Sequence, residues 1–176
     1  MDALRWQAED LLSRPAVLED AAAIAQIYNE GIEDRSATFE TRLRTADDIG
    51  SWFDGIHPIQ VVEQAGRIVA FAATSTYRPR DCYAGVAEVS VYVARDARGR
   101  GAGTAALRAL MEDSRQAGFW KLVSRVFPEN AASRALLRKL NFREVGIYRN
   151  HGRLDGVWKD VVIVERSLGL DDAGEL

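Results

Sequence analysis

The sequence is poor in the residues that build metal sites and disulfide bonds. It contains one cysteine, Cys82, and two histidines, His57 and His151. A single cysteine cannot form an internal disulfide bond and is typical of a reducing compartment. Neither histidine has a cysteine near it in the sequence, which argues against a zinc site. We therefore expect no metal ion.

Long apolar runs and a strong charge of one sign are also missing. No run approaches the roughly 18 apolar residues that a membrane-spanning helix needs. Charged residues interrupt the first fifteen positions, so they contain no apolar signal-peptide core. The formal net charge of −3 argues against nucleic acid as the main partner. We expect a cytoplasmic protein that binds neither membranes nor nucleic acid.

What the sequence does contain suffices for one domain. Its 176 residues are 47% hydrophobic and 28% charged, which is ordinary for a globular protein. We expect an N-terminal extension over residues 1–13, one domain over 14–168, and an acidic disordered tail over 169–176.

The hydrophobic periodicity predicts a mixed α/β (α+β-type) fold. Alternating and β-branched segments predict strands, and apolar residues three and four apart predict helices. The segment 31–44 has no clear period and is expected to be a loop or a broken helix. Because the regular alternation of strand and helix is missing, we expect a mixed sheet flanked by helices. The expected strands are 15–18, 59–63, 68–76, 87–93, 121–127, 142–148 and 157–167, and the expected helices begin at Glu19, Thr45, Thr104 and Asn130, which gives the order β-α-α-β-β-β-α-β-α-β-β.

The most informative segment is the turn RGRGAG at residues 98–103. It follows a predicted strand and leads into a predicted helix. Glycines allow backbone N–H groups to approach a ligand, and the helix N-terminus favours negative charge. Arg98 and Arg100 strengthen that preference. The turn therefore predicts a phosphate site.

Several interpretations of this turn compete. A P-loop needs a lysine, which is missing here. A dinucleotide fingerprint needs Gly-x-Gly-x-x-Gly and a later acidic residue, but the glycines at 99, 101 and 103 fall one residue short and the next strand centres on Arg125. A surface turn without function is a further alternative. The pattern Arg-x-x-Gly-x-Gly, however, is filled by Arg98, Gly101 and Gly103, and it resembles the pyrophosphate loop of the GNAT N-acetyltransferases.

A second motif and the order of elements extend this resemblance over about residues 14–168. Asn130 and Ser133, followed by Leu-Asn-Phe at 140–142, resemble the Asn-x-x-Ser and Leu-Gly-Phe of that family. Asn141 replaces the glycine, and asparagine tolerates the left-handed conformation at a helix end. The resemblance implies a GNAT fold with a mostly antiparallel sheet.

Within this family the chain resembles the phosphinothricin acetyltransferase-like branch, which includes methionine sulfoximine and arsenic-operon (ArsN-type) acetyltransferases. The branch implies acetyl transfer from acetyl-CoA to the α-amine of a small amino acid or a toxic analogue, in a homodimer. The segments that carry this resemblance are IYNEGI at 27–32, SATFE at 36–40, YRPR at 77–80 with Tyr83, AEVSVYV at 87–93 and DGVWKD at 155–160.

The resemblance also assigns the acetyl-CoA contacts. The turn would bind the pyrophosphate, and the strand before it would pair with the pantetheine arm and donate a backbone N–H to the thioester carbonyl. Asn130 is equally suited to cap a helix, and both roles can hold together. The expected contacts are Val91, Tyr92, Val93, Arg98, Gly99, Arg100, Gly101, Ala102, Gly103, Thr104, Asn130 and Ser133.

Glu88 stands where this branch carries its general base. A protonated amine must lose a proton before it attacks, and a carboxylate accepts it directly or through water. The strand alternation places Glu88 on one face with Ser90 and Tyr92. An apolar site would strengthen Glu88 as a base; the alternative is a solvated carboxylate.

Four residues are candidates for the acceptor site. Arg78 and Arg80 match a carboxylate in a bidentate manner, although they are equally consistent with two exposed loop arginines. Phe39 and Tyr83 are expected to wall the pocket, with a core position as the alternative for Phe39.

Two departures separate the chain from phosphinothricin acetyltransferases. Leu-Asp-Gly at 154–156 replaces Lys-His-Gly, and Leu137 replaces a histidine. The form Leu-Asp-Gly-x-Trp resembles that of the arsenic-operon group, and this resemblance implies arsinothricin-like acceptors. We expect Asp155 to shape a turn with Gly156; contact with the ammonium group of the acceptor is the alternative. The hydroxyl groups available to protonate the departing thiolate are those of Tyr148 and Tyr92. The alternative functions are a catalytically silent acetyl-CoA-binding domain and a peptide N-terminal acetyltransferase.

Overall fold

The computed structural model describes residues 11–169, and it contains one sheet of seven strands in the order β1-β2-β3-β4-β5-β7-β6. Neighbouring strands are antiparallel except for β4 and β5, which are parallel. The predicted order of elements and the mixed, mostly antiparallel sheet are confirmed. The strands are β1 (Leu12–Pro15), β2 (Ile59–Gln64), β3 (Arg67–Thr76), β4 (Val86–Val93), β5 (Lys121–Val126), β6 (Arg143–Leu154) and β7 (Val157–Ser167).

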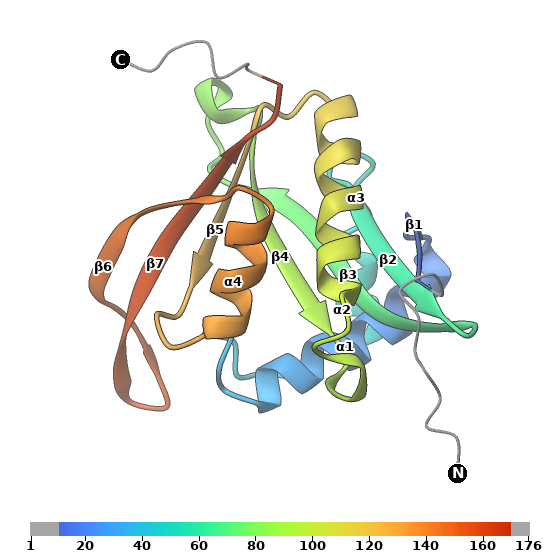
Figure 1. The fold of residues 1–176 in the computed structure, drawn as a ribbon, viewed down its shortest axis with the longest axis horizontal. Coiled ribbons are helices and arrows are strands. Elements are labelled where there is room, and N and C mark those ends of the chain that lie inside the picture. Colours follow the sequence, from blue (N-terminus) through green and yellow to red (C-terminus); the bar gives the residue numbers. More distant parts are fainter. Residues whose placement is uncertain (1–10, 170–176) are drawn as a thin grey trace.

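Helices cover both faces of the sheet. Figure 1 shows α3 and α4 in front of the central strands. A methyl group on Gly103 of α3 would meet Val91 and Val93, whereas one on Gly31 of α1 would meet Tyr92, which points to the opposite face of β4. The helices are α1 (Ala21–Glu33), α2 (Ala46–Gly50), α3 (Ala102–Gln116) and α4 (Ala131–Lys139).

Several predicted boundaries were wrong. The first strand was expected at 15–18 but lies at 12–15, because its antiparallel pairing with β2 runs from Leu12 opposite Glu63 to Pro15 opposite Gln60. The chain then turns into a short 3-10 helix at Leu18–Asp20. Residues 12 and 13 of the expected extension therefore belong to the sheet. Residues 1–10 of this extension and residues 170–176 of the expected tail lie outside the described part.

Two further segments differ from the prediction. Helix α1 continues to Glu33, so only the later part of the segment 31–44 is a loop. Strand β6 runs six residues beyond Tyr148 to Leu154, because it forms a hairpin with β7. The expected end at Tyr148 coincides with a register irregularity between Tyr148 and Gly152, where the alternation is interrupted.

The feature that creates a site is the early separation of β4 from β5. Their pairing joins Val86 to Lys121 and ends with Glu88 opposite Val123. Beyond that pair the strands diverge (Figure 1). At the branch point Ser124 Oγ donates a hydrogen bond of 2.9 Å to the carbonyl of Val89. The rest of this edge of β4 has no strand partner.

No helix within residues 11–169 has the length and apolar character needed to cross a membrane.

Candidate active site

A cleft of about 890 Å³ opens where β4 and β5 diverge. Residues 88–93 of β4 form one side, and residues 124–126 of β5 with Phe127 directly after it form the other. The turn that begins α3, the first turns of α4 and the loop that follows α1 complete the lining. Because Tyr28 and Gly31 of α1 line it together with Gly103 of α3, the cleft is open to both faces of the sheet.

The glycine turn at residues 98–103 lines this cleft and leads into the N-terminus of α3. Gly99 and Gly101 have φ values of 75° and 91°, a conformation that other residues adopt at a cost. Gly101 is the N-cap of α3, and no side chain caps the helix there. The first backbone N–H groups of α3 have no partner within the helix. This arrangement fits an anionic ligand such as a pyrophosphate.

The side chain of Arg98 contacts both β4 and the residue that follows α1. Its Nε donates to the carbonyl of Val93 at 3.2 Å, and its Nη1 lies 2.7 Å from a carboxylate oxygen of Asp34. Arg95 donates to the other oxygen of Asp34 at 2.8 Å. Burial raises the pKa of Asp34, but the two arginines more than offset this, so the pKa lies below its usual value. Arg98 thus joins the turn to β4 and to the end of α1.

Glu88 and Arg125 form an ion pair across the opening of the strands. Nη2 of Arg125 donates to both carboxylate oxygens of Glu88, at 2.8 and 2.9 Å. The side chains are 27% and 50% exposed, and both residues line the cleft. The site around Glu88 is therefore polar and paired with a cation, not the apolar environment considered from the sequence.

Of the two candidate proton donors, only Tyr92 lines the cleft. Its ring stacks on Phe71 at 5.5 Å and meets Tyr28 edge-on at 4.9 Å. Burial raises the pKa of Tyr92, which makes its hydroxyl a weaker acid. Tyr148 is 52% exposed on β6, where its ring lies 4.8 Å from His151.

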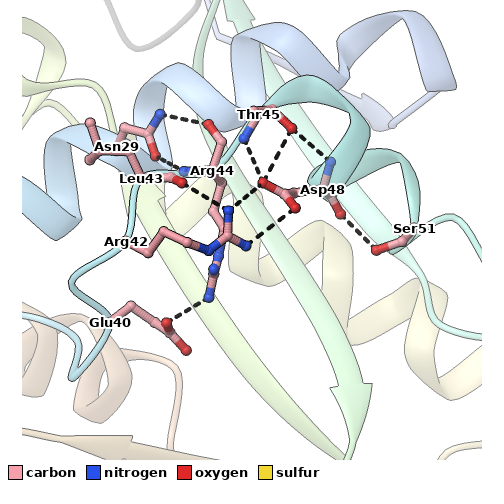
Figure 2. A network of polar contacts seen from close by, with 8 residues as sticks. All are labelled: Asn29, Glu40, Arg42, Leu43, Arg44, Thr45, Asp48 and Ser51. Atoms are coloured by element: carbon pink, nitrogen blue, oxygen red, sulfur yellow. Dashed lines mark hydrogen bonds and ion pairs between the residues drawn. The ribbon is translucent and has the colours of Figure 1, made fainter.

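The loop between α1 and α2 forms the wall opposite the strands and is held at its far end by a polar network (Figure 2). Nδ2 of Asn29 donates to the carbonyl of Arg44, and its Oδ1 accepts from the backbone N–H of Arg44. Arg44 also pairs with Glu40 at 2.6 Å. Thr45 caps α2 through a reciprocal pair of hydrogen bonds with Asp48, which confirms the predicted helix start.

Three contacts tie the near end of this loop to other elements. Arg35 pairs with Asp155 at 3.0 Å, at the tip of the β6–β7 hairpin. Nδ2 of Asn130 donates to the carbonyl of Ser36 at 3.3 Å. Phe39 packs edge-on against the ring of Phe127 at 5.0 Å. The loop is therefore a fixed wall of the cleft.

These features match a known protein family. The model of the acetyltransferase (GNAT) family matches residues 22–142, which include all but the first residue of α1, both strands of the opening and α4.

The chain belongs to the GNAT acetyltransferase family.

Individual relatives are similar over nearly the whole chain. A phosphinothricin N-acetyltransferase of Streptomyces coelicolor is 32% identical over 88% of this chain and 95% of its own length. An L-methionine sulfoximine/L-methionine sulfone acetyltransferase of Pseudomonas paraeruginosa is 32% identical over 88% of this chain and 93% of its own. The chain is thus an acyltransferase with relatives in the predicted branch.

A solved structure supports the same fold. The phosphinothricin acetyltransferase of Sinorhizobium meliloti in complex with acetyl-CoA superimposes with a TM-score of 0.85 at 29% identity, covering 94% of this chain and 92% of that one. The GNAT fold predicted from the sequence is confirmed.

The GNAT cleft brings together most of the predicted cofactor residues. Asn130 caps α4, since its Oδ1 accepts from the backbone N–H of Ser133. Gly103 allows α3 to approach α4, because a Cβ there would lie 2.8 Å from Leu136. Besides Glu88 and Phe39, the predicted residues that line the cleft are Val91, Tyr92, Val93, Arg98, Gly99, Gly101, Ala102, Gly103, Thr104, Asn130 and Ser133; Arg100, in the same turn, is exposed and does not line it.

Three predicted acceptor residues lie elsewhere. Arg78 and Arg80 are exposed in the loop between β3 and β4, and Tyr83 ends a 3-10 turn in the same loop. The guanidinium of Arg78 lies 5.3 Å from the ring centre of Tyr77. None of the three lines the cleft, so their role in the acceptor site stays a prediction.

The predicted turn at Asp155 is confirmed. Leu154 pairs with Val157, and between them Asp155 and Gly156 have φ values of 48° and 80°. Positive φ at both central residues is typical of a type I′ turn, which matches the twist of the two strands of a hairpin. Asn141, at the end of α4, has a φ of 59°, as expected for the residue in place of glycine.

Sequence reasoning missed Arg125 and Asp34 as cleft residues. One signal pointed to Arg125. Side chains alternate along a strand, so those of residues 121, 123 and 125 of β5 lie on one face, and Arg125 lies beyond the part of β5 that pairs with β4. No signal indicated that Asp34 would pair with Arg98. Among residues 11–169 no group of three or more metal-ligating side chains occurs.

We expect the Asp34→Asn substitution to lower the free energy of unfolding by about 1–2 kcal/mol at pH 7, since it removes the charge that pairs with both arginines. The folded-state pKa of Asp34 is lowered, so its stabilising effect is present above the unfolded pKa and is lost as the pH falls through the folded one. The difference from wild type should therefore shrink below about pH 4, measured by urea denaturation at several pH values.

The matched control is Asp155→Asn, which also removes an aspartate paired with an arginine but at a site that is 59% exposed. Asparagine tolerates its positive φ, so we expect a change within about 0.5 kcal/mol. A difference at Asp34 that is the same at pH 7 and pH 3 would contradict the assignment.

Proposed function

We propose that this GNAT enzyme transfers an acetyl group from acetyl-CoA to the α-amine of a small amino acid or toxic amino-acid analogue. Phosphinothricin, methionine sulfoximine and arsinothricin represent the acceptor class. The observation that carries the proposal is that a single cleft contains both an uncapped helix N-terminus and the carboxylate of Glu88. The names of the relatives support the choice of acceptor. The single cysteine is typical of a reducing compartment and supports a cytoplasmic location. Acetylation of a toxic analogue would make the enzyme a resistance determinant.

The donor is proposed to lie along β4. The pyrophosphate would bind the backbone N–H groups that begin α3, with Arg98 and Arg100 adding positive charge nearby. The pantetheine arm would pair with the edge of β4 that no strand covers, and Asn130 and Ser133 border its path. A backbone N–H of this edge would polarise the thioester carbonyl.

The acceptor is proposed to enter on the face that carries Glu88 and Tyr92. Glu88 accepts a proton from the acceptor ammonium, and the freed lone pair attacks the thioester carbon. The new C–N bond forms, the C–S bond breaks, and the thiolate takes a proton from Tyr92 or from water in the cleft. The nitrogen still carries one excess proton after the attack and returns it to that donor, so the products are the amide, the free thiol and a protonated Glu88 that releases its proton to solvent. Phe39 borders this region, and Arg78, Arg80 and Tyr83 would approach it from the β3–β4 loop.

Thiol release from acetyl-CoA tests this proposal. The acceptor panel holds phosphinothricin, methionine sulfoximine, arsinothricin, the ordinary amino acids and short peptides. Turnover of a free amino acid or analogue supports the proposal. Turnover of peptides alone would favour a peptide N-terminal acetyltransferase, and binding of acetyl-CoA without any turnover would favour a silent binding domain.

We expect the Glu88→Gln substitution to lower kcat by about 10²–10⁴-fold, the usual contribution of a general base, while acetyl-CoA still binds. The matched control is Glu63→Gln on β2, because Glu63 is also paired with an arginine and is 26% exposed, yet lies outside the cleft. Steady-state kinetics and calorimetric binding of acetyl-CoA provide the two measurements. An unchanged kcat in the Glu88 variant would show that another group removes the proton.

We also propose a homodimer, formed through the β6–β7 hairpin. Strand β6 ends the sheet, so the backbone groups of its outer edge have no neighbouring strand. The resemblance to dimeric acetyltransferases supports a second copy as the occupant. This hairpin also carries exposed large hydrophobic side chains, namely Val145, Ile147, Tyr148, Val157 and Trp158.

We expect the Ile147→Glu substitution to turn a dimer into a monomer, because it places a charge in the apolar contact. Light scattering after size-exclusion chromatography gives the mass. Ile56→Glu is the matched control, since Ile56 is equally apolar and 65% exposed but lies outside the hairpin. A wild-type protein that is monomeric at all concentrations would refute the dimer.

A further inference from the structure

We propose that Arg125 and Glu88 together bind the acceptor as a zwitterion, with Arg125 on the α-carboxylate and Glu88 on the α-ammonium. This inference rests on the proposed acetylation of an α-amine and adds the means by which an α-amino acid is distinguished from other amines. Neither the family match nor the names of the relatives assign a role to Arg125.

The position of Arg125 follows from the register of the sheet. Glu88 lies opposite Val123 in the last pair between β4 and β5, and side chains that are paired in this way point to the same face. Arg125 is two residues further along β5, so it points to the same face as Glu88. Because the strands have already separated there, its side chain reaches back across the opening to the carboxylate.

The geometry of the pair leaves hydrogen-bonding capacity on both partners. Arg125 uses only Nη2 for Glu88, and none of the hydrogen bonds or ion pairs among the described residues engages its Nε or Nη1. The carboxylate of Glu88 has further lone pairs for a second donor. A guanidinium matches a carboxylate in a bidentate manner. The pair therefore offers a cationic and an anionic group side by side in the cleft.

An α-amino acid carries the complementary arrangement. Its ammonium and carboxylate are attached to one carbon atom, so they can contact Glu88 and Arg125 at the same time. Binding of the carboxylate by Arg125 would hold the amine next to the base that deprotonates it. Positioning of this kind favours reaction, because the reacting groups are already oriented. A simple amine or a side-chain amine would gain only half of these contacts.

An arginine that binds the α-carboxylate must lie in the cleft close to the base, and Arg125 does so whereas Arg78 and Arg80 do not. Arg125 lines the cleft beside Glu88, whereas the other two arginines are exposed in the β3–β4 loop outside the cleft. They remain available for a second polar group of the acceptor, farther from its amine.

The experiment compares L-methionine sulfoximine with its α-carboxamide, which keeps the amine and the side chain but removes the negative charge. We expect Arg125→Gln to raise the KM of the acid about 10- to 100-fold and to change that of the amide by less than about three-fold. The KM of acetyl-CoA should not change. Arg125→Lys keeps the positive charge but loses the planar guanidinium that binds a carboxylate in a bidentate manner, so the KM of the acid should be intermediate. An intermediate KM would also show that the effect of Arg125→Gln does not come from misfolding.

The matched control is Arg115→Gln, because Arg115 pairs with Glu112 and is 53% exposed, close to the 50% of Arg125, but lies at the end of α3 outside the cleft. It should leave both KM values unchanged. The proposal is overturned if Arg125→Gln raises the KM of the acid and of the amide equally. It is also overturned if Arg78→Ala, instead of Arg125→Gln, removes the preference for the acid.

Calorimetric binding of the two compounds in the presence of CoA separates this proposal from the acetylation itself. If wild type releases no thiol with any acceptor but binds the acid more tightly than the amide, and Arg125→Gln loses this difference, the proposed function fails and the zwitterion site stands. If neither compound binds to wild type, the zwitterion site is overturned as well.

Discussion

The structure depends on the point at which two parallel strands stop pairing. Up to Glu88 and Val123 the sheet is continuous, and beyond them β4 has a partner on one side only. Unpaired backbone groups inside a protein are costly unless they find other partners. Here they border a cleft, so a bound ligand can provide those partners. The glycine turn lies at the far end of the same unpaired edge, which aligns the helix N-terminus with it.

Paired charges organise the rest of the cleft. Asp34 connects the end of α1 to two arginines near the glycine turn, and Glu40 connects with Arg44 at the base of the facing wall. Glu88 and Arg125 join the two diverging strands. Each pair links segments far apart in the sequence or holds a loop without regular structure. Besides adding positive charge to the cleft, the arginines hold the elements that line it in place through these ion pairs.

Features that depend on local chemistry could be predicted from the sequence. The cap at Thr45, the left-handed Asn141 and the turn at Asp155 follow from the preferences of those residues for one backbone conformation. The order of elements follows from periodicity, and the glycine turn from its place between a strand and a helix. The exact start of β1 could not be predicted, because its pairing with β2, more than forty residues away, decides it.

The candidate site could be predicted only in part, for the same reason. Val91 and Glu88 share one strand, so their relation was evident from alternation. The contact of Arg125 with Glu88 spans 37 residues and depends on the register of β4 against β5. Arg78 and Arg80 were selected by residue type, and the sequence contained nothing that placed their loop relative to the cleft.

Asn130 shows how one side chain can restrict which substitutions the protein tolerates. Its oxygen accepts from the N–H of Ser133 while its nitrogen donates to the carbonyl of Ser36. Aspartate and serine begin helices as well as asparagine does. Aspartate, however, has no donor for the loop, and serine has a single oxygen for two tasks. A change that is neutral for the helix would thus remove one of the three contacts that hold the near end of the wall, so the loop restricts substitution at this position more than the helix does.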